Sequence, residues 1–208
     1  MSENIDYYGD FSVDKSEPVD CPISSKRVNL ISGKKQKIKN YEIIEKIHRT
    51  EWFNTPAESG RLTDGKYATV ADCNDEAFFH FTAGSARAVM YDLGAVCAVD
   101  GASVGLLRQD STGVGAPPRI SVFLSENGDD WQKVGEFTSI YADKPDAIIR
   151  KNIDFGKKYK ARYAKFCFTV TTHIWIDQFE LFGCTDISDA LDIVGEDENE
   201  NDFPDQYA

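Results

Sequence analysis

The segment Arg61-Leu-Thr-Asp-Gly-Lys-Tyr-Ala68 places a carboxylate beside a glycine, and this pairing suits two roles. In the first, Asp64 and Gly65 form a tight turn, because glycine adopts positive φ and aspartate hydrogen-bonds its own backbone. In the second, the backbone bends around a cation, with carbonyl oxygens and the Asp64 carboxylate as ligands. Asp-Gly turns are common between strands, so the residues alone favour a plain turn and leave the cation site open.

Residues that could perform catalysis are sparse. The chain has no Gly-x-Ser-x-Gly elbow, glycine-rich phosphate loop, His-Glu-x-x-His motif or Cys-x-x-Cys pair. The pair Asp129-Asp130 falls in a predicted turn, and the acidic run of residues 196–200 falls in a polar tail. Neither place offers the walled site that tunes a carboxylate for acid–base chemistry. We therefore predict a non-catalytic domain.

The elements that must position these residues are short strands separated by turn signals. We expect strands over residues 28–31, 35–44, 77–81, 88–92, 96–107, 119–125, 131–137, 152–153, 162–170 and 172–182. Such spacing, without intervening helical patterns, predicts an all-β fold, an antiparallel β-sandwich or jelly roll. Alternation within the strands predicts a core that includes Leu93, Val104, Leu106, Ile120, Val122, Leu124, Phe166, Phe168 and Leu181.

Length and charge limit the classes of function. A chain of 208 residues with 41% hydrophobic content can form one all-β domain with extensions. We expect a polar extension over residues 1–20, the sandwich over 21–184 and an acidic tail or linker over 185–208. The net charge of −12 and the lack of a basic stripe argue against nucleic acid. No apolar run is long enough for a membrane helix, and membrane insertion is not expected.

Five segments occur in a characteristic order: the Thr-Asp-Gly turn, a strand ending in Asp-Leu-Gly, a strand followed by Ser-Glu-Asn-Gly-Asp-Asp-Trp, an Ala-Arg-Tyr strand and a closing Glu-Leu-Phe-Gly strand. This set resembles the discoidin-like (coagulation factor type C, galactose-binding-like) β-sandwich family over about residues 28–184. The resemblance is closest to bacterial carbohydrate-binding modules attached to glycoside-hydrolase-like domains. It implies a discoidin-like jelly roll.

The resemblance also implies a structural Ca²⁺ near Asp64, completed by a side chain from the closing strand. The family commonly has two acidic residues, two apart, before the final glycine, whereas this chain has Gln178 and Glu180. If the first position is the ligand, an amide oxygen replaces a carboxylate and the affinity falls; if the second is, Glu180 preserves the site.

A disulfide between Cys21 and Cys184 is a further implication of the resemblance, because eukaryotic discoidin domains often close in this way. Bacterial members usually lack the bond, so free thiols remain the alternative. The chain has five cysteines, an odd number, so they cannot all pair within one chain.

Sugar recognition needs an aromatic face and a few fixed polar groups. In the resembling modules these lie on loops at one end of the sandwich, and the corresponding loops here hold the candidate ligand-binding residues Trp52, Arg108, Gln109, Asp110, Tyr141 and His173. Trp52 is the expected stacking platform and Arg108 the expected hydrogen-bond donor. The competing interpretation is that Arg108 serves only to pair with Asp110.

The function implied by the resemblance is a carbohydrate-binding module of a secreted or cell-surface protein, which targets an attached enzyme or cell to a glycan. We expect it to be part of a larger multidomain protein and extracellular, although this chain lacks an apolar signal-peptide core. The alternatives are a discoidin-type adhesion domain that binds a protein or surface partner, and a structural spacer without a ligand.

Overall fold

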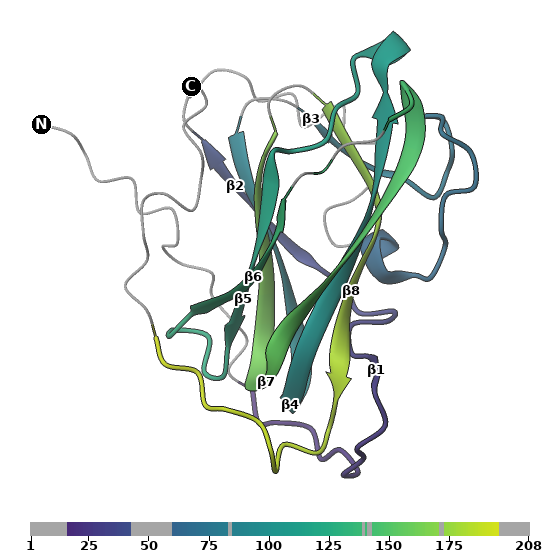
Figure 1. Cartoon of the computed structure of the whole chain (residues 1–208). Helices are drawn as coiled ribbons and strands as arrows, with labels where there is room; N and C mark the ends of the chain where they lie inside the picture. Colours follow the sequence, from purple (N-terminus) through teal and green to yellow (C-terminus); the bar gives the residue numbers. More distant parts are fainter. Residues whose placement is uncertain are drawn as a thin grey trace, which may run out of the picture.

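The computed structural model describes residues 16–42, 60–82, 85–138, 140, 143–170 and 173–195. Within these ranges the regular secondary structure is antiparallel strand, with two short 3-10 turns, η2 (Arg61–Thr63) and η3 (Asp110–Thr112), and no α-helix (Figure 1). The strands are β1 (Val28–Asn29), β2 (Lys37–Glu42), β3 (Phe79–Thr82), β4 (Ser85–Gln109), β5 (Arg119–Ser125), β6 (Gln132–Thr138), β7 (Asp146–Val170) and β8 (His173–Cys184). The predicted all-β fold is confirmed.

The strands β4 and β7 each contribute to both layers of the sandwich. The first part of β4 pairs with β2 and with the end of β7, and its later part pairs with β8 and with the start of β7. The change occurs near Asp92 to Gly101, where the β4–β7 register shifts twice and Gly94 has φ of 81°. Strands that change sheets in this way do so at bulges or bends. Both strands turn at the bottom of the view in Figure 1.

The resulting layers follow from the pairing. One layer runs β6, β5, the end of β7, the start of β4 and β2. The other contains the start of β7, the end of β4, β8, and then β1 and β3 along different lengths of β8. The start of β8 and the end of β4 therefore lie at one end of the sandwich, and the chain enters and leaves at the other.

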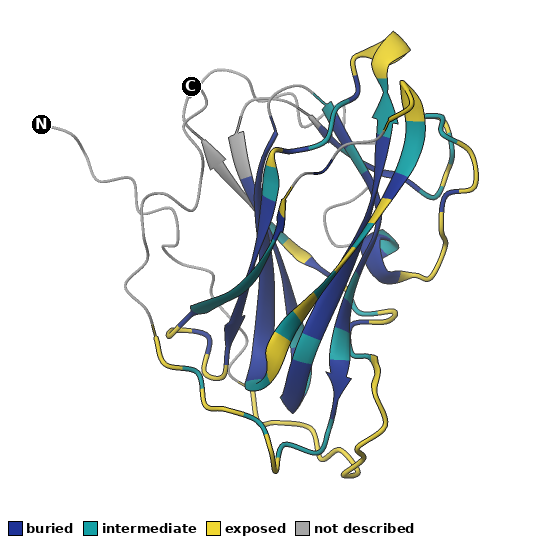
Figure 2. Ribbon diagram, viewed as in Figure 1, coloured by how far each residue is buried: buried dark blue, intermediate teal, exposed yellow. Residues whose placement is uncertain are grey.

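The core between the layers is apolar and well buried (Figure 2). All nine predicted core residues belong to it, each with at most 6% of its surface exposed. Phe166 stacks on Phe179 across the layers, with ring centroids 4.3 Å apart. A smaller apolar cluster on the outer face of β4 and β8 is built from Ala68, Phe78, Leu107 and Val114, with Trp175 packed against it.

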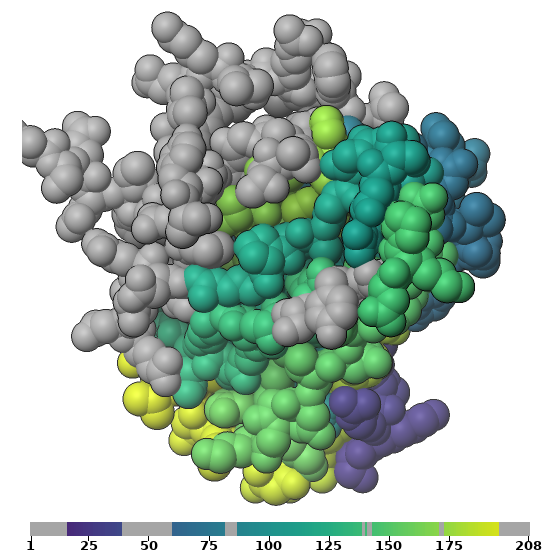
Figure 3. Space-filling model, turned by 45° about the horizontal axis from the view of Figure 1, so that its top comes forward, coloured from purple at the N-terminus to yellow at the C-terminus, as the bar shows by residue number. Residues whose placement is uncertain are grey.

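Residues 185–195 lie along the sandwich. Leu191 exchanges backbone hydrogen bonds with β7, donating to Lys158 O at 2.9 Å and accepting from Lys160 N at 2.8 Å. The side chains of these two lysines pair with Asp189 and Asp192 at 2.8 and 2.6 Å. Figure 3 shows this segment in yellow against the green surface of β7. The first part of the acidic segment is thus paired with Lys158 and Lys160 of β7.

Candidate functional site

Arg108 lies near the end of β4, on the face that carries the core residue Leu106, and we call this end of the core the mouth between the layers. Leu106 points into the main core and is fully buried, and alternation along β4 places Arg108 on the same face, one step nearer the strand end. Its strand partner is Ala147 of β7, whose neighbour Ile149 also belongs to the core. In Figure 3 this end of β4, in teal, adjoins the green start of β7 and the blue segment that contains residues 68–78.

Arg108 and Asp110 form a two-point ion pair. Nε donates to Oδ1 at 2.8 Å and Nη2 donates to Oδ2 at 2.9 Å, while the side chains remain 32% and 47% exposed. The hydrogen bond from Arg108 lowers the pKa of Asp110 below its usual value. Asp110 is itself held by its backbone N–H, which donates to Pro145 O at 3.0 Å. The pair is therefore charged, oriented and open to solvent.

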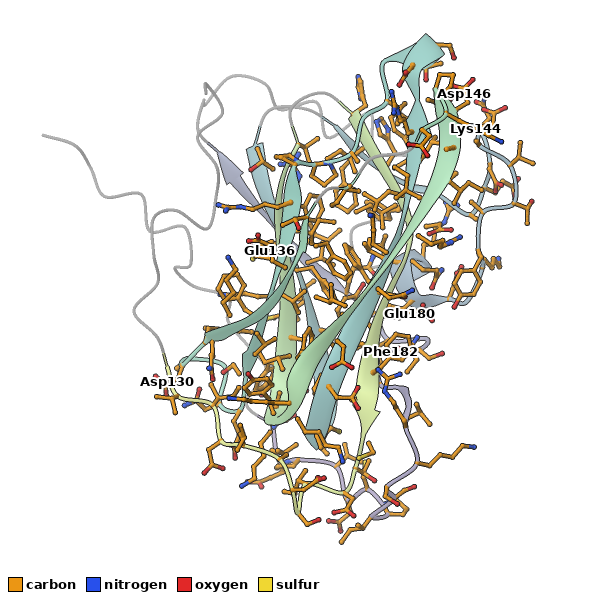
Figure 4. All side chains as sticks on the ribbon, viewed as in Figure 1. Asp130, Glu136, Lys144, Asp146, Glu180 and Phe182 are labelled. Carbon is orange, nitrogen blue, oxygen red and sulfur yellow. The ribbon has the colours of Figure 1, made fainter. Side chains whose placement is uncertain are left out.

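Gln109 faces the opposite side of β4, and its side chain serves the backbone. Its Oε1 accepts from Cys73 N and from Thr112 Oγ1, both at 3.1 Å, and its backbone exchanges hydrogen bonds with Val114. These contacts close the turn of residues 109–114 and attach to it the loop that contains Cys73. Figure 4 places Lys144 and Asp146, the strand partner of Gln109, at this same end.

His173 belongs to an aromatic cluster on the outer face of β3 and β8. Its Nδ1 lies 3.0 Å from His80 Nε2, and the His80 ring stacks on Trp175 with centroids 3.8 Å apart. Burial, and secondarily the neighbouring His173, lowers the pKa of His80 to about 4. A short bridge from His173 to Val114 links the cluster to the 109–114 turn. Nothing in the sequence pattern indicated that His80 and His173 would meet.

The predicted ligand-binding residues therefore divide into three groups. Arg108 and Asp110 lie together at the mouth between the layers, whereas Gln109 and His173 lie on the outer face, joined through Val114. Trp52 and Tyr141 fall outside the described residues. Trp131, the first residue after the 125–130 turn, is 7% exposed and donates from Nε1 to Gly128 O at 3.1 Å.

The turn after η2 surrounds the side-chain amide of Gln178. Its Nε2 lies 2.9 Å from Asp64 Oδ1, 3.1 Å from Lys66 O and 3.3 Å from Arg61 O, so its two N–H groups are shared among three acceptors. Its Oε1 accepts from Gly65 N at 3.2 Å. Of the three predicted metal ligands, Asp64 and Gln178 thus come together around this turn.

Glu180, the third predicted ligand, has other partners. One carboxylate oxygen accepts from Tyr67 Oη at 2.7 Å and the other accepts from Ser103 Oγ. The first of these bonds, more than any other interaction, raises the pKa of Tyr67 to about 12. In Figure 4 Glu180 and Phe182 both project from β8. No group of three or more histidine, cysteine or acidic residues is placed to hold a metal within the described ranges.

Asp177 is a site residue that the sequence analysis missed. It is fully buried at a bulge where the β4–β8 register shifts between Gly105 and Leu106. Its carboxylate pairs with Arg150 of β7 and accepts from Ala68 N at 2.8 Å. The bulge turns Asp177 away from the direction that simple alternation gives, so its role could not be seen in the strand pattern.

The five cysteines are free in the structure, with Cys21 exposed and Cys97, Cys167 and Cys184 buried. Burial, above all other causes, raises the pKa of Cys97 to about 11. Among the described residues, no helix is long and apolar enough to cross a bilayer.

Known folds provide a comparison for this arrangement. A chitosan-binding module of a chitosanase/glucanase from Paenibacillus sp. IK-5 is 15% identical, with a TM-score of 0.48 over 75% of this chain and 99% of that chain. A fucose binding module from Streptococcus pneumoniae is 17% identical, with a TM-score of 0.48 over 78% of this chain and 99% of that chain.

A third such structure is CBM32-1 from a family 31 glycoside hydrolase of Clostridium perfringens, at 18% identity and a TM-score of 0.44, covering 73% of this chain and 96% of that chain. No protein-family model matches the sequence, and no curated protein matches it.

Proposed function

We propose that this chain is a non-catalytic carbohydrate-binding module whose glycan site lies at the mouth between the layers, around Arg108 and Asp110. The observation that supports this most directly is the exposed, two-point ion pair between these residues. Sugar hydroxyls both donate and accept hydrogen bonds, so a fixed guanidinium beside a fixed carboxylate offers complementary groups to neighbouring hydroxyls.

The scaffold supports such a site because hydrogen bonds within the chain hold both side chains in place. The two side chains lie two residues apart, and the backbone of Asp110 is held by Pro145. A group that needs no reordering loses less conformational entropy when the ligand binds. In this proposal Trp52 supplies the aromatic face on which the apolar side of the sugar ring stacks.

Gln109 has a supporting role in the proposal, because its side chain holds the turn that carries Asp110. His173 and Trp175 lie on the outer face of β8. In this proposal they form the outer border of the site and do not contact a sugar between the layers. Tyr141, which precedes β7 in the sequence and lies outside the described residues, completes the predicted set.

We further propose that the module belongs to a secreted or cell-surface multidomain protein and brings an attached enzyme or cell to its glycan. The absence of catalytic motifs in the sequence supports a binding role. The adhesion domain and the ligand-free spacer remain the competing functions.

A glycan array that covers plant, bacterial and mucin sugars, with titration of every hit, tests the proposal. The protein is applied as wild type, as Arg108→Ala and as Arg27→Ala. Arg27 is a matched control: it is 54% exposed and pairs with Asp100 at 2.8 Å beside the β4 bend, at the other end of the sandwich. Hits that are lost in Arg108→Ala but retained in Arg27→Ala support the proposed site. An array without hits would favour the spacer or adhesion function.

A further inference from the structure

We infer that the side-chain amide of Gln178 takes the place of the calcium ion that the sequence resemblance implies, so that the turn of residues 61–67 is closed without a metal. The amide nitrogen is where the oxygens of the turn converge: Asp64 Oδ1, Lys66 O and Arg61 O lie 2.9, 3.1 and 3.3 Å from it. These separations are hydrogen-bond lengths, whereas calcium lies 2.3–2.6 Å from its oxygen ligands.

The orientation of this amide is fixed by its surroundings. With the nitrogen toward three oxygens and Oε1 toward Gly65 N–H, every contact joins a donor to an acceptor. The flipped amide would bring Oε1 against three oxygens and the NH₂ group against an N–H, and such a flip is decided by the hydrogen-bond network. Gln178 is 2% exposed, so bulk water cannot satisfy the wrong orientation.

The charges around the turn also argue against a calcium ion at this position. Calcium prefers six to eight oxygens, several of them anionic. Among the described residues, Asp64 is the one carboxylate whose oxygen accepts a hydrogen bond from this amide. The oxygens of Glu180 accept from Tyr67 and Ser103, and those of Asp177 accept from Arg150 and Ala68. Each of these carboxylates already has its own donors.

The amide therefore cross-links the turn as a bound ion would. It joins three carbonyl or carboxylate oxygens of the turn to the closing strand β8, which is what a bound cation would do by coordination. The consequence is a domain whose stability and ligand binding do not depend on calcium. This inference is independent of the proposed glycan site, because the two rest on different residues.

Calcium titration of the chelator-treated full chain tests the inference directly. Calorimetry should detect no saturable calcium binding, and the melting temperature should be the same with excess EDTA and with millimolar CaCl₂. Asp64→Ala should lower the melting temperature by the same amount in both buffers, roughly 3–6 °C for the loss of the oxygen that accepts from Gln178 Nε2 and from Lys66 N. Saturable calcium binding by wild type, with a calcium-dependent rise in its melting temperature, would overturn the inference.

Gln178→Glu provides the reverse experiment. The substitution removes the NH₂ donor and sets a second carboxylate beside Asp64, so this variant should melt lower than wild type in EDTA and recover part of the difference in calcium. Gln132→Glu is the control for added charge, since Gln132 lies on β6 and its Oε1 accepts from Val194 N; its melting temperature should not respond to calcium. If Gln178→Glu does not fold, the wild-type and Asp64→Ala comparisons still decide.

Discussion

Arg150 and Asp177 form an ion pair directly over Gly105, the residue of β4 that separates their strands. Nη1 donates to Oδ1 at 2.6 Å and Nη2 donates to Oδ2. Asp177 is fully buried, while the Arg150 side chain is 37% exposed and lies over the Tyr67 ring at 4.9 Å. The pair therefore joins β7 to β8 across β4. Ala68 N also donates to the Asp177 carboxylate, and this bond attaches the loop that contains Ala68 to the sheet.

Asp177→Ala should destabilise the protein strongly. It leaves the guanidinium without its carboxylate and the Ala68 N–H without an acceptor, which predicts a loss of about 2–4 kcal/mol in the free energy of unfolding, measured by urea denaturation. Asp189→Ala is the control, because Asp189 is 62% exposed in its pair with Lys158; it should change stability by less than about 0.5 kcal/mol. Equal effects in the two variants would contradict a structural role for the buried pair.

Gly105→Ala should also be destabilising. A Cβ atom at Gly105 would overlap Arg150 Nη1 and Asp177 Oδ1, so the pair would have to move. The expected cost is about 1–3 kcal/mol, typical of overpacking. Gly115→Ala is the matched control, since a Cβ there meets nothing within 4 Å. The check is the difference between the two urea midpoints, and a Gly105→Ala midpoint equal to that of Gly115→Ala would show that the pair adjusts freely.

His80 should make stability depend on pH. Its pKa is lowered to about 4 in the folded protein, mainly by burial, while an unfolded histidine has a pKa of about 6.5. At a pH between these two values the unfolded chain binds one proton more than the folded protein at His80. The free energy of unfolding therefore rises as the pH increases from about 4 to 6.5, and the stabilisation provided by neutral His80 is lost as the pH falls. With allowance for solvent screening at a half-buried ring, the expected change is about 1–2 kcal/mol.

The variant His80→Phe keeps an aromatic ring on Trp175 and removes the titration. The slope of unfolding free energy against pH should become shallower in this window. An unchanged slope would assign the pH dependence to other groups.

Arg108→Ala should weaken glycan binding. For a shallow site we expect the wild-type dissociation constants to lie roughly in the micromolar to millimolar range. Removing the guanidinium should weaken binding by about tenfold or more, as expected for a lost charged hydrogen bond. The melting temperature should hardly change, because the side chain is 32% exposed. Titration calorimetry with an array hit measures the effect, and binding that survives in this variant would place the site elsewhere.

Trp52→Ala should have the same effect on affinity through the loss of the stacking platform, again about tenfold. Its control is thermal stability. A variant that unfolds while Arg108→Ala still binds glycan would identify Trp52 as a packing residue and remove it from the site.

The sequence predicted the fold and the core well because alternation is a local signal. The strand over residues 119–125 was predicted with the bounds of β5, and the predicted core residues Phe166 and Phe168 belong to the core. The continuity of β7 was not foreseen: only residues 152–153 and 162–170 were expected to be strand, since the polar run around Lys157 looks like a loop. Pairing with β4 overrides that local composition.

Other features depend on contacts between distant residues and could not be read from local pattern. Lys165 alternates with the core residues Phe166 and Ala164, yet it is fully buried, with Nζ 4.2 Å from the centroid of the Trp131 ring. Asp64 and Gln178 were both singled out, but their hydrogen bond joins residues 114 positions apart. The sequence could suggest these residues but not whether a cation or an amide connects them.

The passage of β4 and β7 through both layers affects how the domain unfolds. A sandwich built from two separate sheets could lose one sheet and keep the other, but here neither layer can detach without pulling apart strands that also belong to its partner. Unfolding should therefore be all-or-none across the two layers, and the most slowly exchanging amides should be found where β4 pairs with β7 on both sides of the bend. The same arrangement makes folding slow, since that pairing must be assembled from residues far apart along the chain.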